Sequence, residues 1–247
     1  MRNRGDRTAG PARVHRLTTG VTVAALVAVL PVLVLHVLGA GTVDPLALTV
    51  SDYVAVPEGY ALLAVSSAAL AVAGLFVAVA AWRTRLPGAP VLAALTAVWV
   101  IGLGLVAAFP TNVGGAPADI SAVVHRWGGA LVLGLAPVIA MVVARGLVAR
   151  GLVTPGKGPV LLVRLTVATA ALDAAFLLSH VPIVVLGSPG FPLLGLVERV
   201  LYGLVIVLLP VTARALRRGA VTSQNAVLPA AGPAAPAVVA PAAEVAR

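Results

Sequence analysis

Three histidines and one aspartate lie within or at the ends of long apolar stretches of this chain, where ionisable side chains are rare. His36, His125 and His180 belong to three different stretches, and Asp173 precedes His180 by seven residues. Seven residues are about two helical turns, so these two side chains would share one helix face, about 10 Å apart. Ionisable residues inside a membrane usually face the protein interior or water. The spacing therefore predicts a polar cavity beside the helix that carries Asp173 and His180.

Imidazole groups are also ligands that zinc prefers, commonly with water in the fourth position of a catalytic site. A metal site of His36, His125 and His180 would support a metal-dependent membrane hydrolase acting on lipid-like substrates. The chain has no His-x-x-x-His pair and no cysteine, so we predict no metal and no other cofactor, and the three-histidine site stands as the alternative. A triad of Ser179, His180 and Asp173 is excluded because adjacent helical residues point about 100° apart.

The acid has two further interpretations. As a proton relay, Asp173 would make the protein a proton-coupled carrier. As a structural residue, it would hold helices together through a hydrogen bond to another helix. The side chains that could take part in such a bond are those of Ser66, Ser67, Thr96 and Tyr202.

The apolar stretches define the class of protein. Of the 247 residues, 60% are hydrophobic and 10% are charged, whereas a soluble domain carries about 25% charged residues. A membrane span needs about 20 apolar residues in a helix, because lipid offers the backbone no hydrogen-bond partner. We therefore predict an all-α polytopic membrane protein, a bundle of six transmembrane helices. The expected spans are Leu17–Gly39, Gly59–Ala81, Ala89–Phe109, Val123–Ala144, Leu165–Leu186 and Leu194–Ala213.

Positive charge is distributed unevenly between the two sides that these spans create. Fifteen of the seventeen Lys and Arg residues fall on the side of the two termini, and only Arg126 and Arg199 fall on the other. Because cytoplasmic loops carry the excess of Lys and Arg, we predict that both termini are cytoplasmic and that the protein is a multi-pass protein of the bacterial plasma membrane. The same distribution accounts for the net charge of +9 without nucleic acid as a partner.

The spans divide the chain into three parts. Residues 1–16 form a basic cytoplasmic N-terminal tail, residues 17–213 form the six-helix transmembrane domain, and residues 214–247 form an Ala/Pro-rich cytoplasmic tail that we expect to be disordered. The first span is longer than the apolar core of a secretory signal, so we expect it to be retained. Glycines such as Gly102, Gly104, Gly128 and Gly129 predict close helix packing.

Three short outer-loop segments carry a resemblance to a known family. They are DPLALTVSDY (Asp44–Tyr53), FPTN (Phe109–Asn112) followed by His125, and GLVER (Gly195–Arg199). Together they resemble the bacterial, actinobacterial-type six-helix integral membrane proteins called domain of unknown function 998, over about residues 17–213. The family pattern has an acid where this chain has Asn112, so no acid role is expected there.

The resemblance implies an integral membrane protein without an assigned reaction. It also implies that one outer-face site is shared by Ser51, Asp52, Tyr53, Thr111, His125, Glu198 and Arg199.

These observations lead to one functional hypothesis. We expect an outward-facing polar pocket that binds a lipid head group, a small solute or a membrane partner, with the metal-dependent hydrolase and the proton-coupled carrier as alternatives. Membrane lipids are the expected partners, together with another membrane protein or a second copy of the chain. The candidate pocket residues are His36, Ser51, Asp52, Tyr53, Thr111, His125, Asp173, His180, Glu198 and Arg199.

Overall fold

A computed structural model describes residues 4–112, 119–151, 157–188 and 190–227 of the chain. Within these ranges every regular element is helical, and there is no strand. The elements are α1 (Arg4–Leu38), the short 3₁₀ helix η1 (Ser51–Ala55), α2 (Gly59–Arg83), α3 (Ala89–Ala108), α4 (Ile120–Ala149), α5 (Lys157–Leu186) and α6 (Leu194–Val227). The six α-helices are each long and apolar enough to cross a membrane, which confirms the predicted fold class.

The helices extend beyond the predicted spans, mainly at the end of the bundle where the chain starts. Helix α1 begins at Arg4, so most of the predicted N-terminal tail continues the first span as helix. Helix α6 runs to Val227, so residues 214–227 are helical and the prediction of disorder is wrong for them. Ala, Leu and Arg favour helix without needing lipid, and the first proline after this span is Pro229. Residues 228–247 lie outside the described residues.

The outward faces of the helices are as apolar as the interior of the bundle. Leu178 of α5 is 70% exposed and Leu26 of α1 is 61% exposed, whereas Leu201 of α6 is fully buried. A helix that is hydrophobic on all sides belongs in lipid or in the core of a large protein. These exposed leucines are therefore the surface that the hydrocarbon would cover.

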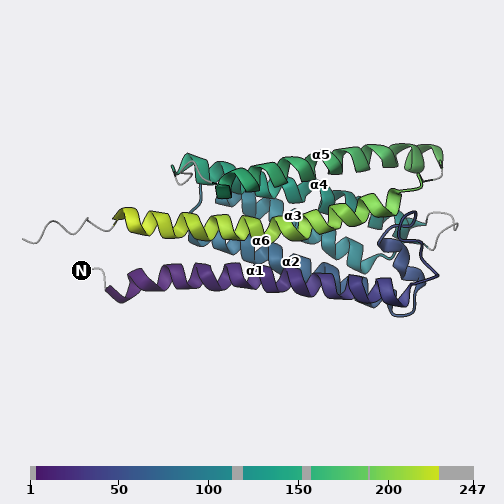
Figure 1. Cartoon of the computed structure of the whole chain (residues 1–247), viewed down its shortest axis with the longest axis horizontal. Helices are drawn as coiled ribbons and strands as arrows, with labels where there is room; N and C mark the ends of the chain where they lie inside the picture. The colour runs from purple at the N-terminus through teal and green to yellow at the C-terminus, as the bar shows by residue number, and fades with distance from the viewer. Residues whose placement is uncertain (1–3, 113–118, 152–156, 189, 228–247) are drawn as a thin grey trace, which may run out of the picture.

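The six helices run along one common axis, and α6 lies between α5 and α1 in the view of Figure 1. Helix α6 packs against α1, α2, α4 and α5, while α5 packs mainly against α4 and α6. The beginning of α1 and the end of α6 lie at one end of the bundle, which we call the terminal end. The loop between α1 and α2, including η1, lies at the opposite end, which we call the loop end.

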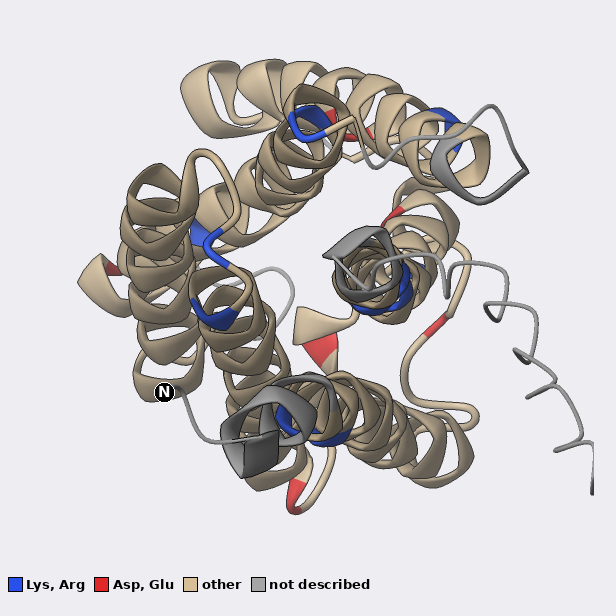
Figure 2. Cartoon of the chain, turned by 90° about the vertical axis from the view of Figure 1, so that its left-hand side faces the viewer, with Lys and Arg blue, Asp and Glu red and all other residues tan. Residues whose placement is uncertain are grey.

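Basic residues mark the terminal end, as Figure 2 shows in a view along the bundle from that side. Arg85 follows the end of α2 and Arg150 follows the end of α4. The Arg150 guanidinium donates a hydrogen bond to the Arg85 carbonyl. The fold thus keeps the charge asymmetry of the sequence, with nearly all cations at one end. Which end faces the cytoplasm remains a prediction from that asymmetry.

Two glycines let α3 and α4 approach closely near the loop end. A Cβ on Gly102 would lie 3.2 Å from the Gly128 carbonyl oxygen, and a Cβ on Gly128 would lie 3.0 Å from the Gly102 carbonyl oxygen. The Trp99 indole N–H also crosses this interface and donates to the Val132 carbonyl at 2.8 Å. The predicted close packing therefore holds for Gly102 and Gly128. Its neighbour Gly129 instead borders open space.

Candidate functional site

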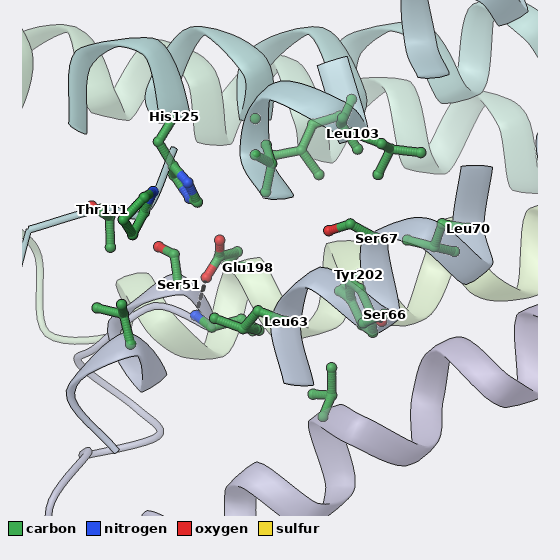
Figure 3. A pocket seen from close by; sticks show the side chains of 18 of the residues that line it. Ser51, Leu63, Ser66, Ser67, Leu70, Leu103, Thr111, His125, Glu198 and Tyr202 are labelled. Carbon is green, nitrogen blue, oxygen red and sulfur yellow. Dashed lines mark hydrogen bonds between the residues drawn. The ribbon is translucent and has the colours of Figure 1, made fainter. Parts of the chain in front are cut away.

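A pocket of about 130 Å³ lies within the bundle near the loop end. Side chains from α1, α2, α3, α4, α6 and the η1 loop line it, and Figure 3 shows them converging from these elements. Apolar cavities near this size bind molecules such as benzene, so the space suits a small group or a short part of a chain. The deeper walls are mainly apolar and include Val32, Leu63, Leu70, Leu103, Val132 and Val205, together with the hydroxyl-bearing Ser66, Ser67 and Tyr202.

Four polar residues gather at the mouth of this pocket, namely Ser51, Thr111, His125 and Glu198 (Figure 3). One carboxyl oxygen of Glu198, Oε2, accepts a hydrogen bond from the Val50 backbone N–H at 2.5 Å. The other carboxyl oxygen turns toward the pocket, between Ser51 and His125. The mouth therefore offers one carboxyl oxygen, two hydroxyl groups and one imidazole to an occupant.

His125 reaches the pocket because a loop is fixed to the start of α4. Its Nδ1 lies 2.8 Å from the Phe109 carbonyl oxygen, and since a carbonyl only accepts, Nδ1 carries the hydrogen. Ser121, one turn earlier, donates to the Pro110 carbonyl at 2.8 Å. The Asp119 side chain caps the helix by accepting from a backbone N–H. Through these contacts the Phe109 and Pro110 carbonyl groups of the FPTN segment hold the start of α4. Nε2 of His125 is left available to an occupant of the pocket.

A second polar cluster, which we call the loop clamp, joins α6 to the loop after α1. Arg199 donates to the Leu48 carbonyl at 2.6 Å and to the His36 Nε2 at 2.9 Å. Its guanidinium also lies over the Tyr53 ring, 5.4 Å from the ring centroid. Tyr53 is buried, so the loop clamp lies in the interior, where the loop packs against α6. His36, Tyr53 and Arg199 are not among the lining residues of the pocket.

The His36 tautomer follows from its two contacts. Nε2 accepts from the Arg199 guanidinium, and Nδ1 lies 2.7 Å from the Val32 carbonyl oxygen. A ring that accepts at Nε2 and donates at Nδ1 is neutral. Both ring nitrogens of His36 are therefore occupied, Nε2 by Arg199 and Nδ1 by a carbonyl of its own helix.

Asp52 serves the loop itself. Its Oδ2 accepts from the Thr49 backbone N–H at 2.6 Å and from the Thr49 hydroxyl at 2.7 Å. The same hydroxyl lies 2.8 Å from the Ser51 hydroxyl, which lines the pocket. Asp52 thus orients Ser51 through Thr49, and it does not line the pocket.

Asp173 and His180 do not line this pocket, because none of its lining residues comes from α5. His180 bonds within its own helix, with Nδ1 2.9 Å from the Phe176 carbonyl oxygen and its ring 4.3 Å from the Phe176 ring. Asp173 is 2% exposed. Helix α5 presents its buried face to α4 and α6 on another side of the bundle.

Two of the four predicted structural partners of Asp173, Ser66 and Tyr202, are bonded elsewhere, whereas the Thr96 hydroxyl has no hydrogen-bond partner among the described residues. Ser66 and Tyr202 lie 2.5 Å apart at their hydroxyl oxygens and both contact the Ala28 carbonyl, at 2.8 and 2.9 Å, which ties α1, α2 and α6 together. Neither carboxyl oxygen of Asp173 has a hydrogen-bond partner among the described residues. A bond from Asp173 to Ser66 or Tyr202 is therefore absent.

The alternative metal site also fails on geometry. His36, His125 and His180 contact three separate carbonyl groups. Across the described ranges, no group of three or more His, Cys, Asp or Glu side chains is placed to hold a metal ion. Histidines near one membrane depth do not converge unless their helices also turn them toward the same point.

Several lining residues were not predicted from the sequence. Tyr60 was not considered at all, and Ser66, Ser67 and Tyr202 were considered only as hydrogen-bond partners of Asp173, but all four line the pocket. The available signal was the Ser66-Ser67 pair within an apolar span, because adjacent hydroxyl residues in a transmembrane helix indicate helix contacts or a cavity.

Comparison with known families and proteins gives one match. A model of the family described as protein of unknown function, DUF998, matches residues 22–215. This range includes α2 to α5 in full, parts of α1 and α6, and every residue that lines the pocket. No curated protein and no solved structure matches the chain.

Proposed function

Since the chain belongs to the DUF998 family, whose function is unknown, we propose a function from the geometry of its pocket: the protein binds one amphipathic, lipid-like molecule at the loop end. The polar part lies at the mouth beside Glu198, and an apolar part enters between the helices. The observation that carries this proposal is the second carboxyl oxygen of Glu198, which turns into a pocket whose deeper walls are mainly apolar.

The chemistry of the mouth favours a polar group that donates hydrogen bonds. A carboxyl oxygen accepts, the Ser51 and Thr111 hydroxyl groups both donate and accept, and the neutral imidazole of His125 accepts at Nε2. An ammonium head group, such as that of phosphatidylethanolamine, satisfies these acceptors. Hydrogen bonds to charged groups contribute about 1.5–3 kcal/mol each, so this contact would dominate selectivity among lipids with similar chains.

The proposed orientation puts the pocket on the non-cytoplasmic side of a bacterial plasma membrane. The support is the positive-inside rule applied to the basic terminal end. A head group from the outer leaflet would then reach the polar residues of the mouth without crossing the membrane, because these residues lie at the same end as the loops.

We test the pocket with a photoreactive phosphatidylethanolamine and the full-length protein in phosphatidylcholine vesicles. Gly129→Leu fills the pocket, since Gly129 lines it and a Cβ there meets no atom within 4 Å. We expect cross-linking to fall at least about tenfold, equivalent to about 1.4 kcal/mol. Gly104→Leu is the matched control, because Gly104 also borders open space and does not line the pocket.

A second variant tests the chemistry of the mouth. Glu198→Gln keeps an oxygen for the Val50 N–H and replaces the other carboxyl oxygen with an amide nitrogen, which donates and does not accept. We therefore expect a selective loss of cross-linking to phosphatidylethanolamine over phosphatidylglycerol. Undiminished cross-linking in Gly129→Leu would refute the pocket. Competition by free ethanolamine at the same strength as by the lipid would identify a solute as the occupant and refute the lipid-like ligand.

A further inference from the structure

The buried face of α5 carries a row of polar side chains that the pocket does not use. Thr166, Thr169 and Asp173 follow one another at helical spacing and are 1%, 0% and 2% exposed. The two threonine hydroxyl groups are satisfied, because each donates to a carbonyl of its own helix, at 2.7 and 2.8 Å. Asp173 differs, since neither of its carboxyl oxygens has a partner among the described residues.

The environment of Asp173 supplies no counter-ion. Helix α5 packs mainly on α4 and α6, and the buried clusters shared by these helices are apolar. Phe176 and Leu201 belong to one cluster, and Ala140 and Leu208 belong to another. Apart from Asp173, the ionisable residues of α4, α5 and α6 lie toward the ends of these helices. The sequence has no other ionisable residue in 127–144, 165–179 or 203–213.

A carboxylate without partner or counter-ion is unfavourable at this depth. On insertion scales an ionised aspartate at the centre of a membrane helix costs about 2.5–3.5 kcal/mol, and an isolated buried charge avoids that cost by becoming neutral. Binding one proton at a carboxyl oxygen makes Asp173 neutral and creates an O–H donor.

We propose that Asp173 is a proton-binding site inside the bundle, occupied by an exchangeable proton in the described structure. The site is separate from the pocket, because α5 contributes no lining residue. Asp173 is 2% exposed, so exchange of its proton requires α5 to move relative to α4 and α6, the helices against which it packs.

Infrared spectroscopy of the full-length protein in phosphatidylcholine vesicles tests this site. We expect the parent protein to show the carbonyl stretching band of a neutral carboxylic acid. This band should be lost in Asp173→Asn and retained in Glu198→Gln. Transfer to heavy water should shift the band to lower frequency. Asp173→Glu keeps an acid at this position and should shift the band without removing it, which assigns the signal even if the Asn variant does not fold.

Two outcomes would overturn the proposal. If folded Asp173→Asn loses no band relative to the parent protein, Asp173 is ionised. If the band persists unshifted after prolonged equilibration in heavy water, the proton does not exchange and the acid is only structural. Neither outcome depends on lipid cross-linking, so the pocket and the proton site can fail separately.

Discussion

Each of the three histidines near the loop end places Nδ1 against a backbone carbonyl, but the consequences differ. His36 and His180 bond within their own helices, whereas His125 bonds to Phe109 outside its helix. Of the three, His125 alone lines the pocket. Residue type and depth therefore identified the right kinds of side chain, while their contacts separated one pocket residue from two residues with local roles.

The loop clamp leads to a prediction about Arg199. Arg199→Lys keeps the positive charge but loses the fork of donors that reaches Leu48 and His36 together. We expect faster hydrogen exchange in the loop that contains η1 and a loss of about 1.5–3 kcal/mol of stability. Hydrogen exchange and thermal unfolding in detergent measure these effects.

Arg126→Lys provides the comparison, since Arg126 is an exposed arginine at the same end of the bundle. Equal loop protection in the two variants would mean that the charge, and not the geometry of the guanidinium, holds the loop.

At the scale of elements, the first turns of α6 explain the GLVER segment. Gly195, Glu198 and Arg199 share one helix face because they are three and four residues apart. Gly195 admits the loop, since a Cβ there would lie 2.0 Å from the Leu48 carbonyl oxygen. Glu198 and Arg199 then bind loop groups at Val50 and Leu48. The segment is a docking surface for the loop, and it also places Glu198 in the pocket mouth.

This arrangement predicts different outcomes for two glycines of α6. Gly195→Ala should displace the loop, lower the melting temperature by several degrees and weaken lipid cross-linking at the pocket. Gly203→Ala should leave the melting temperature unchanged or raise it, because a Cβ there meets no atom within 4 Å and alanine favours helix by about 1 kcal/mol over glycine. Thermal unfolding of both variants in detergent measures the difference, and equal melting temperatures would contradict the close approach at Gly195.

At the scale of the whole molecule, α6 packs against four helices while α5 lies toward the edge. The pocket is built around α6, and Asp173 lies on the side where α5 meets α4 and α6. The bundle thus contains two separate polar regions, one near the loop end and one closed among helices. The leaflet that supplies the pocket depends on an orientation in the membrane that the charge distribution predicts.

Cysteine labelling tests that orientation directly, because the chain has no cysteine of its own. Thr42→Cys introduces an exposed thiol at the loop end, and Ala149→Cys introduces one at the terminal end. In intact cells, an impermeant maleimide should label Thr42→Cys, and it should label Ala149→Cys only after permeabilisation. The reverse pattern would put the pocket in the cytoplasm and refute the proposed source of the lipid.

The sequence by itself determined the class of protein and the approximate positions of six helices, because long apolar stretches have one stable form in lipid. It also indicated through short loop segments that Glu198, Arg199 and His125 belong to the loop end. The extension of α6 to Val227 escaped prediction because helix propensity outside lipid is a weaker signal than hydropathy.

Only the tertiary structure decided how each helix is rotated about its axis. In a soluble helix the apolar face marks the core, but here Leu178 faces outward at 70% exposure and Leu201 is fully buried. Rotation is set by packing, by glycine contacts and by bonds such as those at Arg199, which join residues far apart in sequence. For that physical reason Asp173 and His180 could be assigned a depth and a shared face, while their direction, toward α4 and α6 and away from the pocket, emerged only from the folded bundle.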